Sequence, residues 1–353
     1  MKRKILVSVL YCVLFFVCLE GGARLVLLHT SFLDSKRIIS DSYFRLKLIR
    51  TCYSEGVRWF FDGDYLYDPL MGWILKPNIN GSIRNDPNKA LHTNSKGIRG
   101  TFEYSYQPPD KKRILVLGDS FTFGDEVADD KTYPYYLQQL LPGSQVLNFG
   151  ICGYGHDQML LYFKNEGVKY KPEIVILGFA PSDLSRNMLV FYLRPKPKFK
   201  LADNGLQLTN VPVPTIRSVL NQEVYKLKII DWVLMTQSSS GRGKYYFRER
   251  WKLTEAIFDE LVKVIKECGA KPLFVYISTP LAISKNKQST EKAFEDSFEQ
   301  YCKERGVPYL FTRPYFKSAI QKGVHLKEEG HWDAQGNLIV AQAIAEYFKD
   351  FAG

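Results

Sequence analysis

Short apolar runs, each followed closely by a glycine or a proline, recur through the C-terminal two thirds of the chain. They cover residues 114–117, 146–149, 174–177 and 273–277. Runs of four or five apolar residues without polar alternation are typical of strands that are buried on both faces of a parallel sheet. The pattern therefore predicts at least four buried parallel strands between residues 113 and 280.

Helical periodicity separates these runs. Ile257, Leu261, Val264 and Cys268 recur at spacings of three and four, and Gly269 is the expected stop of that helix. Similar patterns predict helices over 291–305 and from about residue 333 to the end of the chain. Strands that alternate with helices indicate an α/β fold in which helices cover both faces of a parallel sheet.

The N-terminus has a different pattern. Three basic residues precede the apolar run 5–19, and Glu20 and Arg24 then interrupt a weaker apolar continuation to Leu28. Residues 1–28 are long enough to span a bilayer as an uncleaved signal anchor, and cleavage of a signal peptide after Ala23 is the alternative. Both interpretations export the remainder of the chain, because the basic end stays in the cytoplasm. We therefore expect a membrane-anchored protein with its main domain on the extracytoplasmic side, periplasmic or extracellular.

The rest of the chain divides into two regions. Residues 29–112 are polar and rich in aromatic residues and turn formers, and they end in a linker that contains Pro108 and Pro109. Residues 113–353 form the α/β domain, which carries an insertion at about 190–250. Asp203-Asn204-Gly205 predicts a hairpin turn within this insertion.

Composition narrows the choice of partners. The 353 residues carry a formal net charge of +11, which favours anionic headgroups or acidic polysaccharides. Neither a zinc-finger spacing nor a glycine-rich phosphate loop occurs, so nucleic acid is not an expected partner. The six cysteines show no metal-ligand spacing; we expect Cys268 and Cys302 as separate thiols, with a bridge between them as the alternative.

Candidate chemistry follows the predicted strands. Ser120 comes after the first strand, Gly153 lies in a glycine-rich turn after the second, and Ser182 follows the third. The carboxyl ends of parallel strands meet at one edge of the sheet, where ligands bind. A nucleophile beside donors for a developing oxyanion is the requirement of an acyl-transfer site.

A serine nucleophile also needs a base. His331 precedes the final helix, and Glu328, three positions earlier, is the candidate acid that orients the imidazole, with Glu329 as the alternative. His156 is interpreted as a residue of a surface turn, with contact to substrate as the alternative.

These blocks resemble the SGNH or GDSL-like hydrolases, over roughly residues 113–353. The segment from Gly118 to Gly124 is similar to the nucleophile block of that family, and Glu328 and His331 occupy its D-x-x-H position. The resemblance implies a flavodoxin-like three-layer α/β/α fold with a central parallel sheet and no metal or organic cofactor. It also implies an oxyanion hole formed by the amides of Ser120 and Gly153.

Two positions depart from the family pattern. Ser182 stands where the family has an asparagine as third oxyanion donor, and Glu328 replaces an aspartate. Asn187 is the alternative third donor, although a cap or surface position suits it better.

The sequence thus predicts a serine-dependent ester hydrolase or O-acyltransferase that acts on an acylated polysaccharide or lipid. The alternative is an inactive SGNH-like module that binds glycan or an envelope assembly. The sequence does not indicate the oligomeric state.

Overall fold

The computed structural model describes residues 2–34, 38–56, 63–107, 110–203, 205–239, 243–284 and 288–350. Pro108 and Pro109 of the predicted linker and Asn204 of the predicted turn lie outside this part of the chain. The chain forms two compact units. The smaller comprises Met1–Trp73, Leu189–Pro197 and Asn210–Arg248, and the larger comprises Ile74–Met188, Lys198–Thr209 and Glu249–Gly353.

The larger unit is built on a five-stranded sheet in which every neighbouring pair is parallel. Its strands are β5 (Lys112–Gly118), β6 (Ser144–Gly150), β7 (Ile174–Phe179), β12 (Lys271–Tyr276) and β13 (Tyr309–Phe311). The spatial order β13-β12-β7-β5-β6 is, in chain order of these strands, 2-1-3-4-5 read from the β6 edge. This is the flavodoxin-like order, so the predicted fold class is confirmed.

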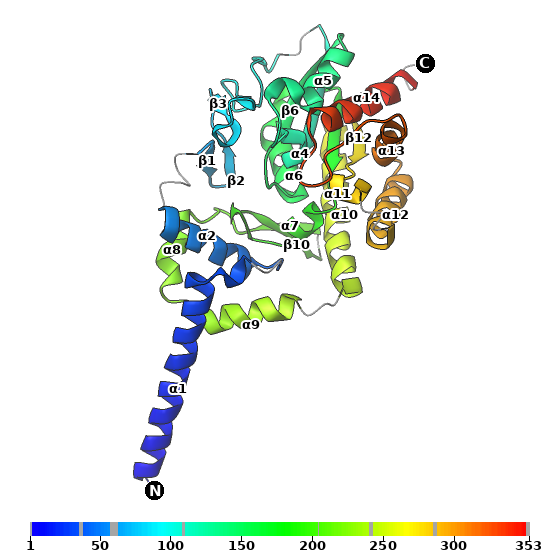
Figure 1. Cartoon of the computed structure of the whole chain (residues 1–353). Helices are drawn as coiled ribbons and strands as arrows, with labels where there is room; N and C mark the ends of the chain where they lie inside the picture. The colour runs from blue at the N-terminus through cyan, green and yellow to red at the C-terminus, as the bar shows by residue number, and fades with distance from the viewer. Residues whose placement is uncertain are drawn as a thin grey trace. The chain divides into compact units, whose positions relative to one another are not determined.

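Helices cover both faces of this sheet (Figure 1). One face packs on α5 (Tyr133–Leu140), α13 (Arg313–Gln321) and α14 (Ala334–Asp350) through a core that includes Val116, Leu137 and Val340. The other face packs on α6 (His156–Asn165), α10 (Gly243–Glu267) and α12 (Gln288–Arg305), largely through aromatic pairs such as Phe258 with Phe274. Both faces of each central strand are therefore buried, as their mostly apolar runs predict.

Shorter elements complete the larger unit. They are β3 (Asn80–Ser82), β4 (Ala90–His92), β10 (Lys198–Ala202), β11 (Gly205–Thr209), α4 (Ser120–Phe123), α7 (Asp183–Arg186), α11 (Pro280–Ser284), and the 3₁₀ turns Ile83–Asn85, Asp129–Lys131 and Gly167–Tyr170. The strands β10 and β11 form the antiparallel hairpin that Asp203 to Gly205 predicts. A bridge between Arg99 and Asn148 places the segment after β4 along the outer edge of β6, which covers that edge strand.

The smaller unit is mainly helical. It contains α1 (Lys2–His29), a 3₁₀ turn (Ser31–Leu33), α2 (Asp41–Glu55), β1 (Tyr65–Asp68), β8 (Phe191–Tyr192), β9 (Arg194–Pro195), α8 (Ile216–Glu223) and α9 (Lys228–Ser239). The short strand β2 (Gly72–Leu75), which pairs with β1, and the helix α10 each run across the boundary between the units. The helices α1, α2 and α9 of the smaller unit meet at an apolar core that includes Leu27, Tyr43, Leu46 and Met235.

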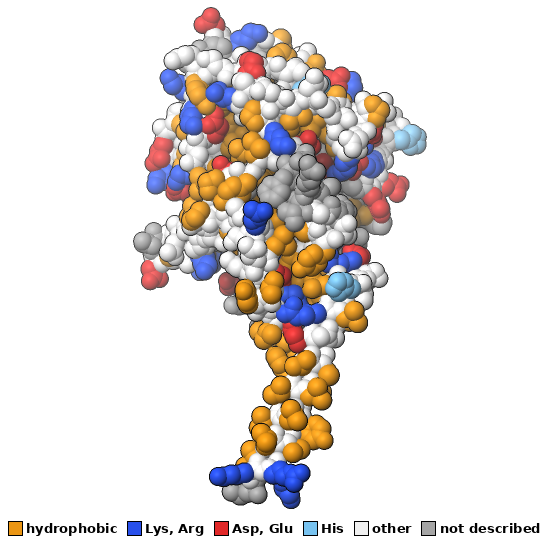
Figure 2. All heavy atoms as spheres, turned by 90° about the vertical axis from the view of Figure 1, so that its left-hand side faces the viewer, with side chains coloured by type: hydrophobic (Ala, Val, Ile, Leu, Met, Phe, Trp, Pro, Cys, Tyr) orange, Lys and Arg blue, Asp and Glu red, His pale blue; other side chains and the backbone are white. Residues whose placement is uncertain are grey.

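The helix α1 is long and apolar enough to cross a membrane, and little of it is buried. Hydrophobic side chains cover its free length, and basic residues lie at its N-terminal end (Figure 2). These properties suit either a membrane anchor or a signal sequence.

Candidate active site

Ser120 is the first residue of α4, directly after β5. Asp119 caps this short helix, because its Oδ1 accepts a hydrogen bond of 2.9 Å from the backbone N–H of Phe121. Gly150, at the end of β6, allows α4 to approach closely: a Cβ at that position would lie 2.2 Å from the nitrogen of Phe123. The sequence thus fixes Ser120 at the carboxyl edge of the sheet, with its amide in the first turn of a helix, where no intrahelical acceptor exists.

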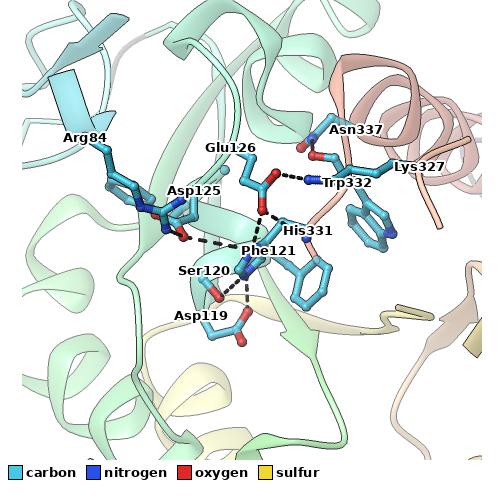
Figure 3. A network of polar contacts seen from close by, with 12 residues as sticks. Arg84, Asp119, Ser120, Phe121, Asp125, Glu126, Lys327, His331, Trp332 and Asn337 are labelled. Atoms are coloured by element: carbon cyan, nitrogen blue, oxygen red, sulfur yellow. Dashed lines mark hydrogen bonds and ion pairs between the residues drawn. The ribbon is translucent and has the colours of Figure 1, made fainter. Parts of the chain in front are cut away.

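The side chains of Ser120 and His331 meet. The Nε2 atom of His331 lies 2.7 Å from the Oγ of Ser120, although 211 positions separate the two residues in the chain (Figure 3). The imidazole also packs against the ring of Phe121, with 4.8 Å between ring centroids. The next residue, Trp332, is held in place by a hydrogen bond of 3.1 Å from its Nε1 to the carbonyl of Ser278. This geometry is that of a nucleophile and its base.

Two carboxylates face the other nitrogen of His331. The Nδ1 atom lies 3.6 Å from Oε1 of Glu126 and 3.9 Å from Oδ2 of Asp125 (Figure 3). The same Oε1 of Glu126 accepts from the backbone N–H of His331 at 3.5 Å. Lys327 and Arg84 form ion pairs with Glu126 and Asp125 respectively, which hold these carboxylates in place.

The environment keeps Glu126 ionised. Partial burial acts to raise the pKa of Glu126, but the hydrogen bond and charge of Lys327, together with His331, outweigh it and lower the pKa below its usual range. A fixed negative charge therefore lies beside the Nδ1 side of His331, where it stabilises an imidazolium.

Glu328 and Glu329 lie in the segment before His331, and both are exposed. Glu328 lines a cavity of about 350 Å³ together with Phe316, Ile320 and Trp332. Glu126 was not predicted from the sequence. The available signal was a pair of acidic residues, Asp125 and Glu126, in the loop that directly follows α4.

The two predicted oxyanion donors after β6 and β7 differ in their surroundings. Gly153 is buried in the turn after β6 at a φ of +82°, a conformation that favours glycine. Ser182 is exposed, and its hydroxyl lies 3.4 Å from Oδ1 of Asp183.

A buried network behind the site was also not predicted. One guanidinium nitrogen of Arg186 donates at 2.9 Å to Oδ2 of Asp119 and at 2.9 Å to the carbonyl of Tyr154, and it lies 2.5 Å from Oδ1 of Asp183. Burial raises the pKa of Asp183 well above its usual range, against the opposing effect of Arg186. Arg186 therefore joins the three loops that follow β5, β6 and β7.

The structure corrects the interpretation of His156 as a surface residue, and it places Asn187 as the C-cap of α7, one of the two positions expected for it. His156 is fully buried rather than a residue of a surface turn, and this burial, together with the charge of Arg186, lowers its pKa to about 3, so the ring is neutral. Asn187 is also fully buried, and its amide nitrogen contacts His156 Nδ1 at 3.1 Å and Thr254 Oγ1 at 2.9 Å. Both side chains belong to the interior, because α6, α7 and α10 enclose them.

Within the part of the chain that the structure describes, no group of three or more His, Cys, Asp or Glu side chains could hold a metal ion. All six cysteines are free thiols, with Cys302 buried and Cys268 half-buried.

A serine–histidine pair at the carboxyl edge of a parallel sheet with this strand order defines a flavodoxin-like α/β protein with the geometry of an acyl-transfer site. The model of the GDSL-like Lipase/Acylhydrolase family matches residues 116–332, and the chain belongs to that family. No curated protein matches the chain.

Solved structures with similar folds include Axe2, an acetylxylan esterase from Geobacillus stearothermophilus. It is 15% identical, with a TM-score of 0.41, and the match covers 67% of this chain and 93% of the esterase. A member of the lipolytic protein G-D-S-L family from Veillonella parvula is 13% identical, with a TM-score of 0.42 and coverage of 67% and 98%.

Proposed function

We propose that this protein cleaves or transfers ester-linked acyl groups, with Ser120 as the nucleophile and His331 as the general base. The observation that carries the proposal is the contact of 2.7 Å between Ser120 Oγ and His331 Nε2 in a member of an acylhydrolase family. The contact has the reach that proton transfer requires.

The proposed reaction has two halves. The Oγ of Ser120 attacks the acyl carbon while its proton passes to His331 Nε2; the ester C–O bond then breaks, and the leaving alcohol takes that proton. In the second half, His331 removes a proton from water or from an acceptor hydroxyl, whose oxygen attacks the acyl carbon. The bond from this carbon to Oγ of Ser120 then breaks, and His331 returns the proton to Oγ. Water gives hydrolysis, and a sugar hydroxyl gives transfer. The amides of Ser120 and Gly153 are the proposed donors to the oxyanion.

We assign the orienting acid to Glu126 in place of Glu328. The assignment is supported by the distance of 3.6 Å between Glu126 Oε1 and His331 Nδ1 and by the lowered pKa of Glu126. This separation exceeds a hydrogen bond, so Glu126 acts chiefly by its charge in the free enzyme.

Glu126→Gln tests this assignment. It is expected to lower kcat by about 10- to 100-fold, less than the loss of about 10⁴ for a hydrogen-bonded triad aspartate. Glu328→Gln is the matched control, because Glu328 is exposed, and it is expected to stay within about twofold of wild type. Steady-state hydrolysis of a chromogenic acetyl ester by the full chain measures both. A larger loss in Glu328→Gln than in Glu126→Gln would restore the assignment made from the sequence.

Ser182→Ala tests the third oxyanion donor. Loss of such a donor costs about 10²- to 10³-fold in kcat where the donor is preorganised. Ser182 is exposed and its hydroxyl faces Asp183, so we expect a loss of less than about tenfold. A fall of 100-fold or more in the same ester assay would show that Ser182 does replace the asparagine of the family.

The proposed substrate is an acylated molecule of the cell envelope or extracellular space, with a polysaccharide preferred and a lipid as the second choice. The apolar helix α1 supports a position at a membrane, and the net charge of +11 suits anionic material there. Acetate release from acetylated polysaccharides, compared with release from short acyl glycerides, distinguishes the two classes. A folded wild-type chain that binds glycan without turnover of either class would favour the inactive binding module.

A further inference from the structure

The helix α9 of the smaller unit buries charged side chains and exposes apolar ones. A helix on the surface of a water-soluble domain does the reverse. Its inward positions are Lys228, Asp231 and Met235, at spacings of three and four, and all three are buried. Its outward positions include Ile230 and Val233, which are 52% and 47% exposed. Surface helices in water place their apolar stripe toward the core and their charges outward.

The inward charges of α9 form ion pairs with neighbouring helices. Asp231 forms ion pairs with Arg45 of α2 and accepts a hydrogen bond of 2.7 Å from the hydroxyl of Ser42. Lys228 pairs with Glu223 of α8, which also pairs with Arg45. The charged face is therefore committed to the interior of this unit, and rotation of α9 to exchange its two faces would leave several buried charges without partners.

Apolar side chains are also exposed in the segment just before α9. Val224 and Tyr225, in the turn that precedes the helix, are 66% and 87% exposed, and Leu234 is 47% exposed. Large exposed apolar side chains that cluster in this way mark a surface that meets an apolar partner.

Helix α1 fixes α9 in position. The carboxylate of Glu20 accepts hydrogen bonds from the backbone N–H groups of Lys228 and Ile229, at 3.0 and 3.1 Å, and so caps the first turn of α9. Arg24 pairs with Glu20 at 2.7 Å and donates to the carbonyl of Lys226 at 3.0 Å. The two charges that interrupt the apolar run of α1 are thus the residues that bind the α8–α9 turn, and Figure 1 shows α9 beside the C-terminal part of α1.

The length of the apolar run of α1 indicates where α9 lies relative to a bilayer. The uninterrupted apolar run of α1, residues 5–19, rises about 22 Å at about 1.5 Å per residue. The hydrocarbon core of a bilayer is about 30 Å thick. A bilayer that begins at residue 5 of α1 therefore extends past Glu20, to the level at which α9 begins.

We propose that the outward face of α9, formed by Ile230, Val233 and Leu234 with Val224 and Tyr225, lies in the boundary between lipid headgroups and acyl chains of the membrane that α1 spans. The proposal rests on α1 as a membrane anchor. The paired charges on the inner side of α9 remain within the protein, and the apolar side chains are buried in lipid, as in interfacial amphipathic helices.

Spin labels on the full chain in phosphatidylcholine–phosphatidylglycerol vesicles test the proposal. Single labels are placed at Ile230→Cys or Val233→Cys, in a background with Cys12, Cys18, Cys152 and Cys268 replaced by alanine. The matched control is Ile320→Cys in α13, which is 45% exposed and lies in the larger unit. A separate variant keeps the native Cys12, which is exposed on α1, and lacks the other three cysteines. Its label reports on the anchor alone.

The expected result is that labels at 230 and 233 collide with oxygen more than with a nickel chelate, by at least about threefold in the ratio of collision rates relative to Ile320→Cys. A lipid-exposed Cys12 with water-exposed labels at 230 and 233 would overturn the proposal for α9 and leave the anchor intact. Water exposure at Cys12 as well would overturn both. Dipolar broadening between labels at 230 would assign the face to a second copy of this chain and would also overturn the proposal.

Discussion

Ser120→Ala is expected to lower the turnover of an acetyl ester by a factor of about 10⁴ or more while the protein stays folded. Without Oγ no acyl-enzyme forms, and only binding and oxyanion stabilisation contribute to the remaining rate. The side chain is small and its hydroxyl contacts His331, whereas Asp119 caps α4 through the backbone of Phe121. The substitution therefore leaves the structural contacts of α4 in place.

The ester assay and a thermal unfolding curve of the full chain in detergent measure the two parts of this expectation. Ser182→Ala is the control, because it removes a hydroxyl from a neighbouring loop. Retention of more than about a tenth of the wild-type rate in Ser120→Ala, with the melting temperature unchanged, would contradict the assignment of the nucleophile.

Arg186→Ala is expected to cause the largest loss of stability, about 3–5 kcal/mol in the free energy of unfolding. Arg186 pairs with the fully buried side chains of Asp119 and Asp183, and the alanine leaves the Asp119 carboxylate without its cation. For a unit of this size the loss corresponds to a fall of roughly 6–20 °C in the melting temperature. Activity should fall with it, since Arg186 joins the loops that carry Ser120 and Gly153.

Arg84→Ala is the matched control for this prediction. The side chain of Arg84 is 64% exposed and pairs with Asp125, so its loss is expected to change stability by less than about 1 kcal/mol. Thermal unfolding followed by intrinsic fluorescence compares the two variants. Equal melting temperatures for Arg186→Ala and wild type would show that the buried network does not stabilise the loops.

The sheet was predictable because its central strands are buried on both faces. The strands β5, β6, β7 and β12 each contain a run of mostly apolar residues with a glycine or a proline close behind it, so they stand out without any alignment. The strand β13 was missed, since it has three residues at the edge of the sheet, and its side chains are only half-buried. Such a strand has too few residues for its periodicity to distinguish it from a loop.

The site was predictable to the extent that its residues follow strands. Ser120 and His331 were identified from their places in the α/β pattern and from the family resemblance. Glu126 was not, because only the fold brings a loop residue to a histidine 205 positions later in the chain. Arg186 was missed for a related reason: a single arginine carries no sign in the sequence that it is buried between Asp183, three positions earlier on α7, and Asp119 of another segment.

The helix α1 illustrates a further limit. In the sequence, Glu20 and Arg24 interrupt an apolar run because they are polar. Their partners, the amides and carbonyl at 226–229, are more than 200 positions away. A polar residue in an apolar helix therefore indicates a partner, but the sequence does not show which one.

The most direct test of the central claim is the site of covalent labelling by a fluorophosphonate. The full wild-type chain in detergent is treated with the probe, digested and analysed by mass spectrometry, beside Ser120→Ala and His331→Ala. The account predicts a single adduct on the peptide that contains Ser120, absent in Ser120→Ala and slowed by about 10³-fold or more in His331→Ala. A folded wild-type chain that forms no adduct, or forms it on another residue, would contradict the claim that Ser120 is an activated nucleophile.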